Sequence, residues 1–69
     1  MKKINKEVFK KLLKDNKMSI TSFSKDLGIS RDTLNNWLHR NINVPEWKCE
    51  VIEEYCLETF GYYPDDLFI

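Results

Sequence analysis

The sequence predicts an all-α fold in which five helices surround one small core. Apolar residues recur at the spacing of a helix, and no run alternates with the period of two expected of a strand. The chain has 69 residues, 42% of them hydrophobic, with only two Gly and two Pro, which is typical of one compact domain over residues 1–69. A chain this short buries only about 60% of its unfolded surface, so we expect no deep catalytic pocket.

Four helix starts share one local chemistry. A capping residue is preceded by an apolar residue and followed by another four positions on, which is the hydrophobic staple. The four sets are Ile4, Asn5 and Phe9; Met18, Ser19 and Phe23; Ile29, Ser30 and Leu34; and Ile42, Asn43 and Trp47, with Glu46 completing a capping box. They predict helices over 6–16, 20–27, 31–40 and 44–59.

Each predicted helix has an apolar face. The inward residues are Val8, Phe9, Leu12 and Leu13 in the first helix, Leu34, Trp37 and Leu38 in the third, and Val51, Ile52, Tyr55, Cys56 and Phe60 in the fourth. The second helix ends at Gly28 and the fourth at Gly61, because glycine best adopts the left-handed conformation that closes a helix.

The last segment, "YYPDDLFI", predicts a fifth, short helix. Pro64 suits the first helical position, and Asp65 and Asp66 suit the positive end of a helix dipole.

Residues 20–38 have the spacing of a helix-turn-helix. Ser24 is small where the two helices cross closely, Gly28 makes the turn, and Ile29, Leu34 and Trp37 fill the gap between the helices. The alternative is a plain helical hairpin in a small bundle. A short second helix followed by a glycine turn favours the helix-turn-helix, because this arrangement presents a recognition helix.

The stretches "MSITSFSKDLGISRDTLNNWL" and "CLETFGYYPDDLF" resemble the Cro/repressor family of phage and bacterial helix-turn-helix regulators, over about Val8 to Phe68. The resemblance implies a five-helix lambda-repressor-like domain and a small sequence-specific DNA-binding transcriptional regulator of phage or prophage type. The chain departs from the family at three positions. Ile20 replaces a frequent Gln, Ser24 replaces a small Ala, and Leu38 follows the Trp where a polar residue is common.

The predicted third helix carries the candidate base-reading residues. By resemblance, Arg31, Asp32 and Asn36 occupy the family's base-reading positions, with Asn35 as a further candidate. Arg can bridge guanine, Asn can pair with adenine, and Asp can accept from cytosine. Asp32 has an equal alternative role, since an acid in the first turn also stabilises the helix dipole.

The candidate phosphate contacts are Ser19, Thr21, Arg40 and Asn41. The start of the second helix offers unpaired amide donors to a phosphate. Arg40 can instead stabilise the end of its helix through the dipole.

The net charge of zero hides a strong asymmetry. Residues 1–44 hold ten Lys or Arg against four acids, whereas residues 45–69 hold one Lys against seven acids. The basic part can steer toward a polyanion. We therefore expect double-stranded operator DNA as the partner, with a homodimer or a heterologous repressor as a further partner.

The acidic part supports an alternative function, in which the fold docks on a partner repressor and alters its DNA binding. Trp47, Tyr62, Tyr63, Phe68 and Ile69 are the candidate protein interface, unless they fill the core.

Other functions find little support. Cys49 and Cys56 would lie roughly 10 Å apart along one helix, too far for a disulfide, and we expect them to be small buried hydrophobes. His39 has no ligand cluster around it, so we expect no metal and no cofactor. The sequence shows no nucleophile with a base and no phosphate-binding glycine loop, so we expect no enzyme. With no signal peptide or membrane span, the expected location is the cytoplasm.

Overall fold

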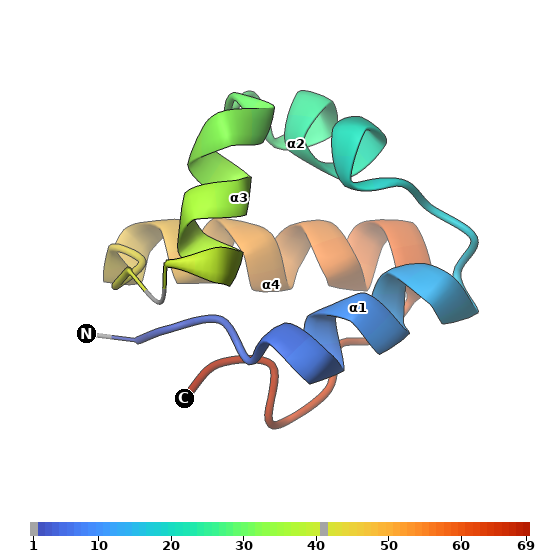
Figure 1. Cartoon of the computed structure of the whole chain (residues 1–69). Coiled ribbons are helices and arrows are strands. Elements are labelled where there is room, and N and C mark those ends of the chain that lie inside the picture. The colour runs from blue at the N-terminus through green and yellow to red at the C-terminus, as the bar shows by residue number, and fades with distance from the viewer. Residues whose placement is uncertain (1, 41) are drawn as a thin grey trace.

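The protein was analysed as a computed structural model, which describes residues 2–40 and 42–69. Four helices occur in this part of the chain: α1 (Lys6–Asp15), α2 (Ile20–Leu27), α3 (Arg31–His39) and α4 (Glu46–Phe60) (Figure 1). The all-α prediction is confirmed. The prediction of five helices is wrong, because the last segment takes another conformation.

Three of the four predicted caps are confirmed. The side chains of Asn5, Ser19 and Ser30 accept hydrogen bonds from the backbone amides of Val8, Ser22 and Thr33, respectively. The Ser30 bond is 3.1 Å long. Each cap pairs an amide that has no partner within its own helix, so each start is set by residues close in sequence.

The predicted cap of α4 is wrong. The helix begins at Glu46, and Pro45 in the cap position provides no side-chain hydrogen bond. A proline disfavours the helical conformation in the residue before it, and the Val44 amide instead donates to the Lys2 carbonyl at 2.7 Å. Trp47 is consequently 64% exposed and forms no staple with Ile42, which is 43% exposed.

The C-terminal segment forms a turn and an extended strand-like end in place of the fifth helix. The Leu67 amide donates to the Pro64 carbonyl, which closes a turn through Asp65 and Asp66. The chain then runs antiparallel to the N-terminal segment, where Lys3 and Ile69 exchange two backbone hydrogen bonds of 2.8 Å each. Backbone groups that would have paired within a helix are paired across the molecule.

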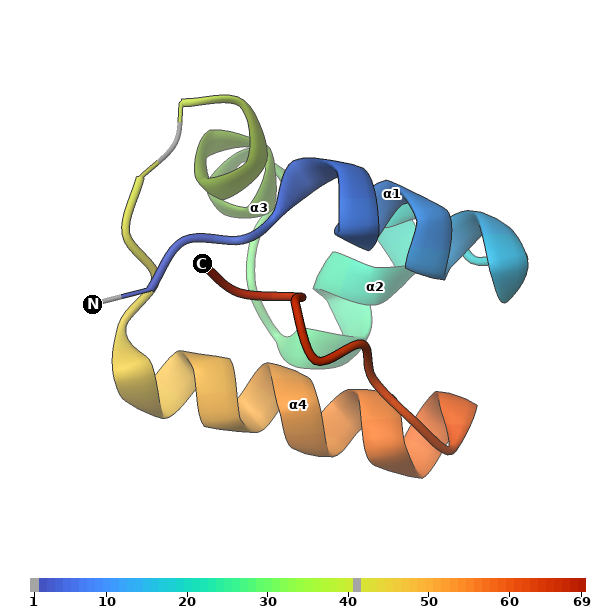
Figure 2. The ribbon, with the colours of Figure 1, turned by 90° about the horizontal axis from the view of Figure 1, so that it is seen from below.

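The core lies between α4 on one side and α1 and α3 on the other, with α2 packed against both groups (Figure 2). Phe23 lies at its centre and is fully buried. The rings of Phe9 and Tyr55 pack edge-on against the Phe23 ring, with centroid distances of 5.0 and 5.1 Å, respectively. Cys49 and Cys56 are buried free thiols, as predicted. The buried hydrophobic residues are Ile4, Phe9, Leu12, Leu13, Phe23, Leu34, Trp37, Leu38, Val44, Cys49, Ile52, Cys56 and Leu67.

The predicted inward face of α4 needs one correction. Val51 is 37% exposed, whereas Cys49 is buried, so the buried stripe runs through Cys49, Ile52 and Cys56. In the described part of the chain, no helix has the length and apolar character needed to cross a membrane.

Candidate nucleic-acid interface

The turn between α2 and α3 is built as the sequence predicts. Gly28 ends α2 in the left-handed conformation, with φ 73° and ψ 25°, and its amide donates to the Lys25 carbonyl. The Ile29 amide then donates to the Ser24 carbonyl at 3.1 Å. A Cβ atom added to Gly28 would meet nothing within 4 Å. Glycine is therefore favoured here by the left-handed backbone conformation and not by a lack of space for a side chain.

The inner faces of α2 and α3 hold the two helices together. Ser24 is only 3% exposed, and its hydroxyl donates to the Thr21 carbonyl at 3.0 Å, so the buried polar atom has a partner. From α3, Leu34, Trp37 and Leu38 are all buried. The opposite side of α3 is therefore left to solvent.

The four candidate base-reading residues all lie on α3, within two turns. Arg31 and Asp32 are exposed at its N-terminal end, and Asn35 and Asn36 follow one turn later and are half-buried. Residues four apart are neighbours on a helix surface, so Arg31 lies beside Asn35 and Asp32 beside Asn36. This surface, which we call the α3 face, offers a cation, a carboxylate and two amides.

The candidate phosphate residues lie at two separate places. Ser19 and Thr21 are exposed at the start of α2, where the Ser19 hydroxyl already accepts from the Ser22 amide and donates to the Ser22 hydroxyl. Arg40 is exposed just after α3. Asn41, the fourth candidate, lies outside the described residues. The amides at the start of α2 remain as anion donors, because the Ser19 side chain pairs only one of them.

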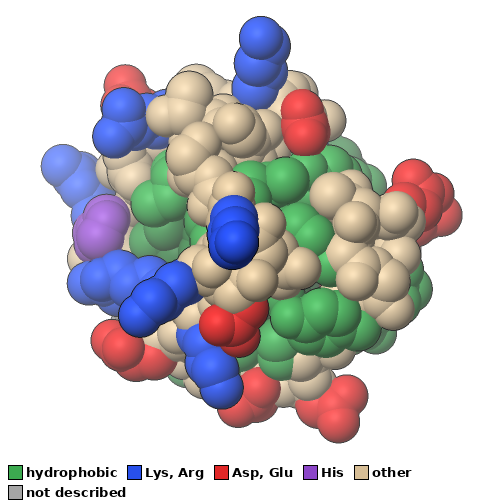
Figure 3. Space-filling model, turned by 90° about the vertical axis from the view of Figure 1, so that its right-hand side faces the viewer, with side chains coloured by type: hydrophobic (Ala, Val, Ile, Leu, Met, Phe, Trp, Pro, Cys, Tyr) green, Lys and Arg blue, Asp and Glu red, His purple; other side chains and the backbone are tan. Residues whose placement is uncertain are grey.

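The charge asymmetry of the sequence is also present in space. Figure 3 views the molecule from the right of Figure 1, which places the side of α1 and α3 to the left and the side of α4 to the right. Lys and Arg side chains lie mostly in the left half and centre of this view, together with some Asp and Glu, whereas its right rim carries Asp or Glu and, among the described residues, no Lys or Arg. The basic side is therefore the one that can approach a polyanion.

The candidate protein-interface residues do not form one surface. Trp47 is 64% exposed, Tyr62 44% and Ile69 69%, whereas Tyr63 and Phe68 are half-buried and pack against the core. Trp47 lies at the start of α4, whereas Tyr62 follows its other end, and a helix of 15 residues is about 22 Å long.

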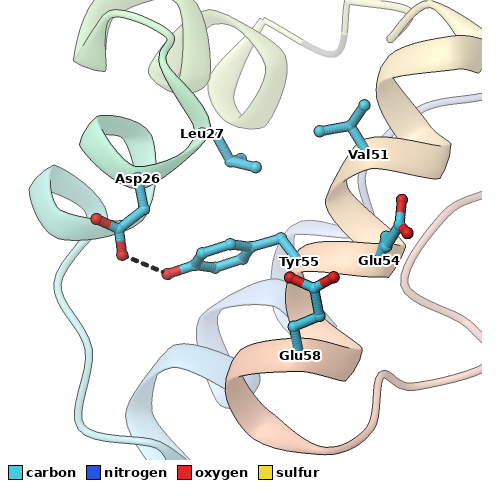
Figure 4. Close-up of a pocket in the computed structure, with 6 residues that line it drawn as sticks. All are labelled: Asp26, Leu27, Val51, Glu54, Tyr55 and Glu58. Carbon is cyan, nitrogen blue, oxygen red and sulfur yellow. Dashed lines mark hydrogen bonds between the residues drawn. The ribbon is translucent and has the colours of Figure 1, made fainter.

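One surface was not foreseen from the sequence. A pocket of about 300 Å³ lies between α2 and α4 and is lined by Asp26, Leu27, Val51, Glu54, Tyr55 and Glu58 (Figure 4). The Tyr55 hydroxyl donates to the Asp26 carboxylate at 2.7 Å. Burial, followed by the bond to Asp26, raises the pKa of Tyr55. The sequence carries no sign of this surface, because it predicts that Val51 faces the core, whereas Val51 is 37% exposed and lies one turn after the exposed Trp47.

Within residues 2–40 and 42–69, no three His, Cys, Asp or Glu side chains come together as a possible metal site. The two cysteines are protonated thiols in the core, since burial raises the pKa of Cys49 and raises that of Cys56 to about 11. This buried environment does not favour a reactive thiolate.

Comparison with known proteins agrees with this geometry. A family model of the Cro/C1-type HTH DNA-binding domain matches residues 8–69, nearly the whole chain, which confirms the resemblance seen in the sequence. No curated protein and no solved structure shows significant similarity to the chain. From the match and from the helix-turn-helix built by α2 and α3, we conclude that the chain belongs to the Cro/C1-type helix-turn-helix family of DNA-binding regulators.

Proposed function

We propose that this DNA-binding protein is a sequence-specific transcriptional regulator of phage or prophage type, which places α3 in the major groove of its operator. The α3 face carries this proposal, because its side chains offer the donors and acceptors that distinguish base pairs. Family membership supports DNA as the ligand.

Each residue of the α3 face has a proposed role. Arg31 is exposed at the head of the helix and suits the O6 and N7 atoms of guanine, while Asn35 and Asn36 suit adenine. Asp32 suits the amino group of cytosine or stabilises the start of α3. A residue at the head of a recognition helix is the one that approaches base edges first.

Phosphate contacts are proposed on both sides of the α3 face. The amides at Ser19 to Thr21 and the Arg40 guanidinium would bind the DNA backbone, which sets the position of α3 without reading sequence. We further propose binding as a homodimer, since two half-sites one helical turn apart gain affinity together.

The test is a salt-titrated binding assay on DNA flanking the protein's own gene. We expect saturable, sequence-selective binding that weakens steeply with salt. The reason is that Lys and Arg side chains that contact DNA phosphates release the counterions condensed there. Arg31→Ala and Asn36→Ala should each cost about 1 to 3 kcal/mol of discrimination at one base pair. Lys14→Ala, an exposed cation on α1, is the matched control. Unchanged operator binding in both α3 variants would show that α3 does not read the sequence.

We also propose a second function, docking on a partner repressor to change its DNA binding. The observation that favours it is the outer surface of α4, where Trp47 is 64% exposed among Glu50, Glu54 and Glu58. Size-exclusion chromatography with the regulator encoded next to its gene should then show a complex. A lone monomer that binds operator with nanomolar affinity would contradict this function.

A further inference from the structure

We propose that the α2–α4 pocket binds a basic amphipathic helix of another protein. The inference rests on the second proposed function, docking on a protein partner, and adds the surface that is used and the chemistry of the partner. The pocket is defined by its six lining residues, Asp26, Leu27, Val51, Glu54, Tyr55 and Glu58.

The pocket offers apolar contact area. Leu27 from α2 and Val51 from α4 line it from opposite walls, and the Tyr55 ring extends from α4 toward Asp26 of α2 (Figure 4). Val51 is 37% exposed, and Trp47, one turn earlier on α4, is 64% exposed. The pocket has a volume of about 300 Å³, and an apolar side chain of a partner placed in it would leave water together with Leu27 and Val51, which favours binding.

The charges around the pocket select a basic partner. Asp26, Glu54 and Glu58 line it, and none of its lining residues is Lys or Arg. Asp26 already accepts the Tyr55 hydroxyl, which leaves Glu54 and Glu58 to meet incoming cations. An apolar anchor flanked by Lys or Arg would satisfy both features of the pocket.

A second copy of this chain is a poor occupant. A two-fold pairing of α4 with α4 would bring Glu54 and Glu58 against their own counterparts, and like charges in an interface oppose association. The helix with a basic exposed surface is α1, through Lys10, Lys11 and Lys14. Among the described residues, however, α1 carries no exposed large hydrophobic side chain that would enter the pocket.

The walls of the pocket indicate a helix rather than an added strand. Both walls are helices, whose backbone groups pair within each helix, so neither offers a sheet edge. Recognition must then come from side chains, as when an amphipathic helix lies along a surface. The distance from Trp47 to Glu58 on α4 is about 16 Å, so about three turns of a partner helix would cover it.

The experiment measures binding of a fluorescein-labelled model helix by fluorescence anisotropy. The probe is a peptide of about 12 residues with Leu along one face, Arg on both flanks and Ala elsewhere. We expect saturable binding to the wild type, weakened about tenfold by Glu54→Lys with Glu58→Lys, which corresponds to about 1.4 kcal/mol. The matched control is Asp65→Lys with Asp66→Lys, the same charge change at two exposed acids of the C-terminal turn outside the pocket, which should leave the affinity unchanged.

Two control peptides separate docking from simple charge attraction. Replacing every Leu with Ser, or every Arg with Glu, should each weaken binding about tenfold or more. Equal binding of the Ser peptide would overturn the proposal, and so would equal effects of the Asp65, Asp66 variant and the pocket variant. No binding of the Leu and Arg peptide would also overturn it. Circular dichroism and thermal melting of each variant verify that it is folded.

A complex with the neighbouring regulator distinguishes this inference from the function on which it rests. If the complex forms and the Glu54→Lys, Glu58→Lys variant still forms it equally well, the pocket is not the docking surface, although docking itself holds. If no complex forms with any variant, the docking function fails, whatever the peptide shows.

Discussion

Gly28 shows how one residue sets the geometry of the α3 face. Its φ of 73° turns the chain between α2 and α3, and the angle between these helices decides how α3 is presented. The space around it is open, so only the backbone conformation demands glycine. A residue with a Cβ pays a cost in the left-handed region of about 1 to 2 kcal/mol.

Gly28→Ala should therefore lower the free energy of unfolding by about 1 kcal/mol, measured by urea denaturation. Gly28→Asn is the comparison, because asparagine tolerates the left-handed conformation better and should cost less. If alanine were as well tolerated as asparagine, strain at φ would not be what keeps glycine at this position.

The Cys56 thiol makes the free energy of unfolding depend on pH in the alkaline range. Burial raises its pKa from 9.0 to about 11, so the folded state favours the protonated thiol. The stabilisation is complete below pH 9.0 and is lost as pH rises toward about 11, since the unfolded chain gives up its proton first.

We expect the free energy of unfolding to fall between about pH 9 and about pH 11, and to fall less steeply in Cys56→Ala. Urea denaturation at a series of pH values measures both slopes. Comparing slopes rather than absolute stabilities removes the loss of packing that the substitution also causes. Identical slopes would show that Cys56 does not contribute to the pH dependence.

At the scale of elements, local and distant interactions decide different helix ends. The caps of α1, α2 and α3 depend on a side chain and an amide three residues away, which is why the sequence predicted them. The start of α4 depends on Pro45 and on the pairing of Val44 with Lys2, a residue 42 positions earlier. No pattern around residue 43 reveals that distant partner.

The position of α2 against α4 depends on Tyr55. Its ring packs edge-on against Phe23 and its hydroxyl bonds to Asp26, both of which belong to α2. The amides proposed to bind phosphate, at Ser19 to Thr21, lie at the start of that same helix. Tyr55 thus holds α2, and with it one part of the proposed DNA-binding surface, to the core.

A double-mutant cycle of Tyr55→Phe and Asp26→Ala should give a coupling energy of about 1 kcal/mol in the free energy of unfolding. Tyr55→Phe keeps the ring contacts and removes only the hydroxyl. We also expect this variant to bind operator more weakly while keeping its base preference. A coupling energy near zero would mean that water replaces the bond without cost.

At the scale of the whole molecule, the two ends of the chain close the fold together. The amides of Lys3 and Asn5 donate to the carbonyls of Ile69 and Leu67, each at 2.8 Å, while Lys2 pairs with Val44. Leu67 is 1% exposed and lies in the core. The C-terminal segment is therefore part of the domain that supports α3.

Leu67→Ala should cost about 2 to 5 kcal/mol, a large share of the roughly 5 to 15 kcal/mol that a native domain has in total. Ile69→Ala is the matched control, because its side chain is 69% exposed and its backbone bonds to Lys3 remain. Thermal melting and urea denaturation compare the two. Equal losses would mean that the side chain of Leu67 adds nothing to the core.

Much of the proposed DNA-binding surface was predictable because it lies on one helix. Once Leu34 and Trp37 are assigned to the core, the period of an α-helix places Arg31, Asp32, Asn35 and Asn36 on other faces. The α2–α4 pocket was not predictable, since Asp26 and Val51 are far apart in sequence and meet only when two helices pack.

The sequence by itself determined the all-α class, three of the four helix starts, the glycine turn and the residues of the α3 face, because each depends on neighbours within about one or two turns. Only the tertiary structure decided that α4 starts after Pro45 and that the chain ends extended. It also decided that an acidic pocket forms beside Tyr55. The physical reason is that backbone pairing between the chain ends, and packing between α2 and α4, join residues whose separation in sequence carries no local signal.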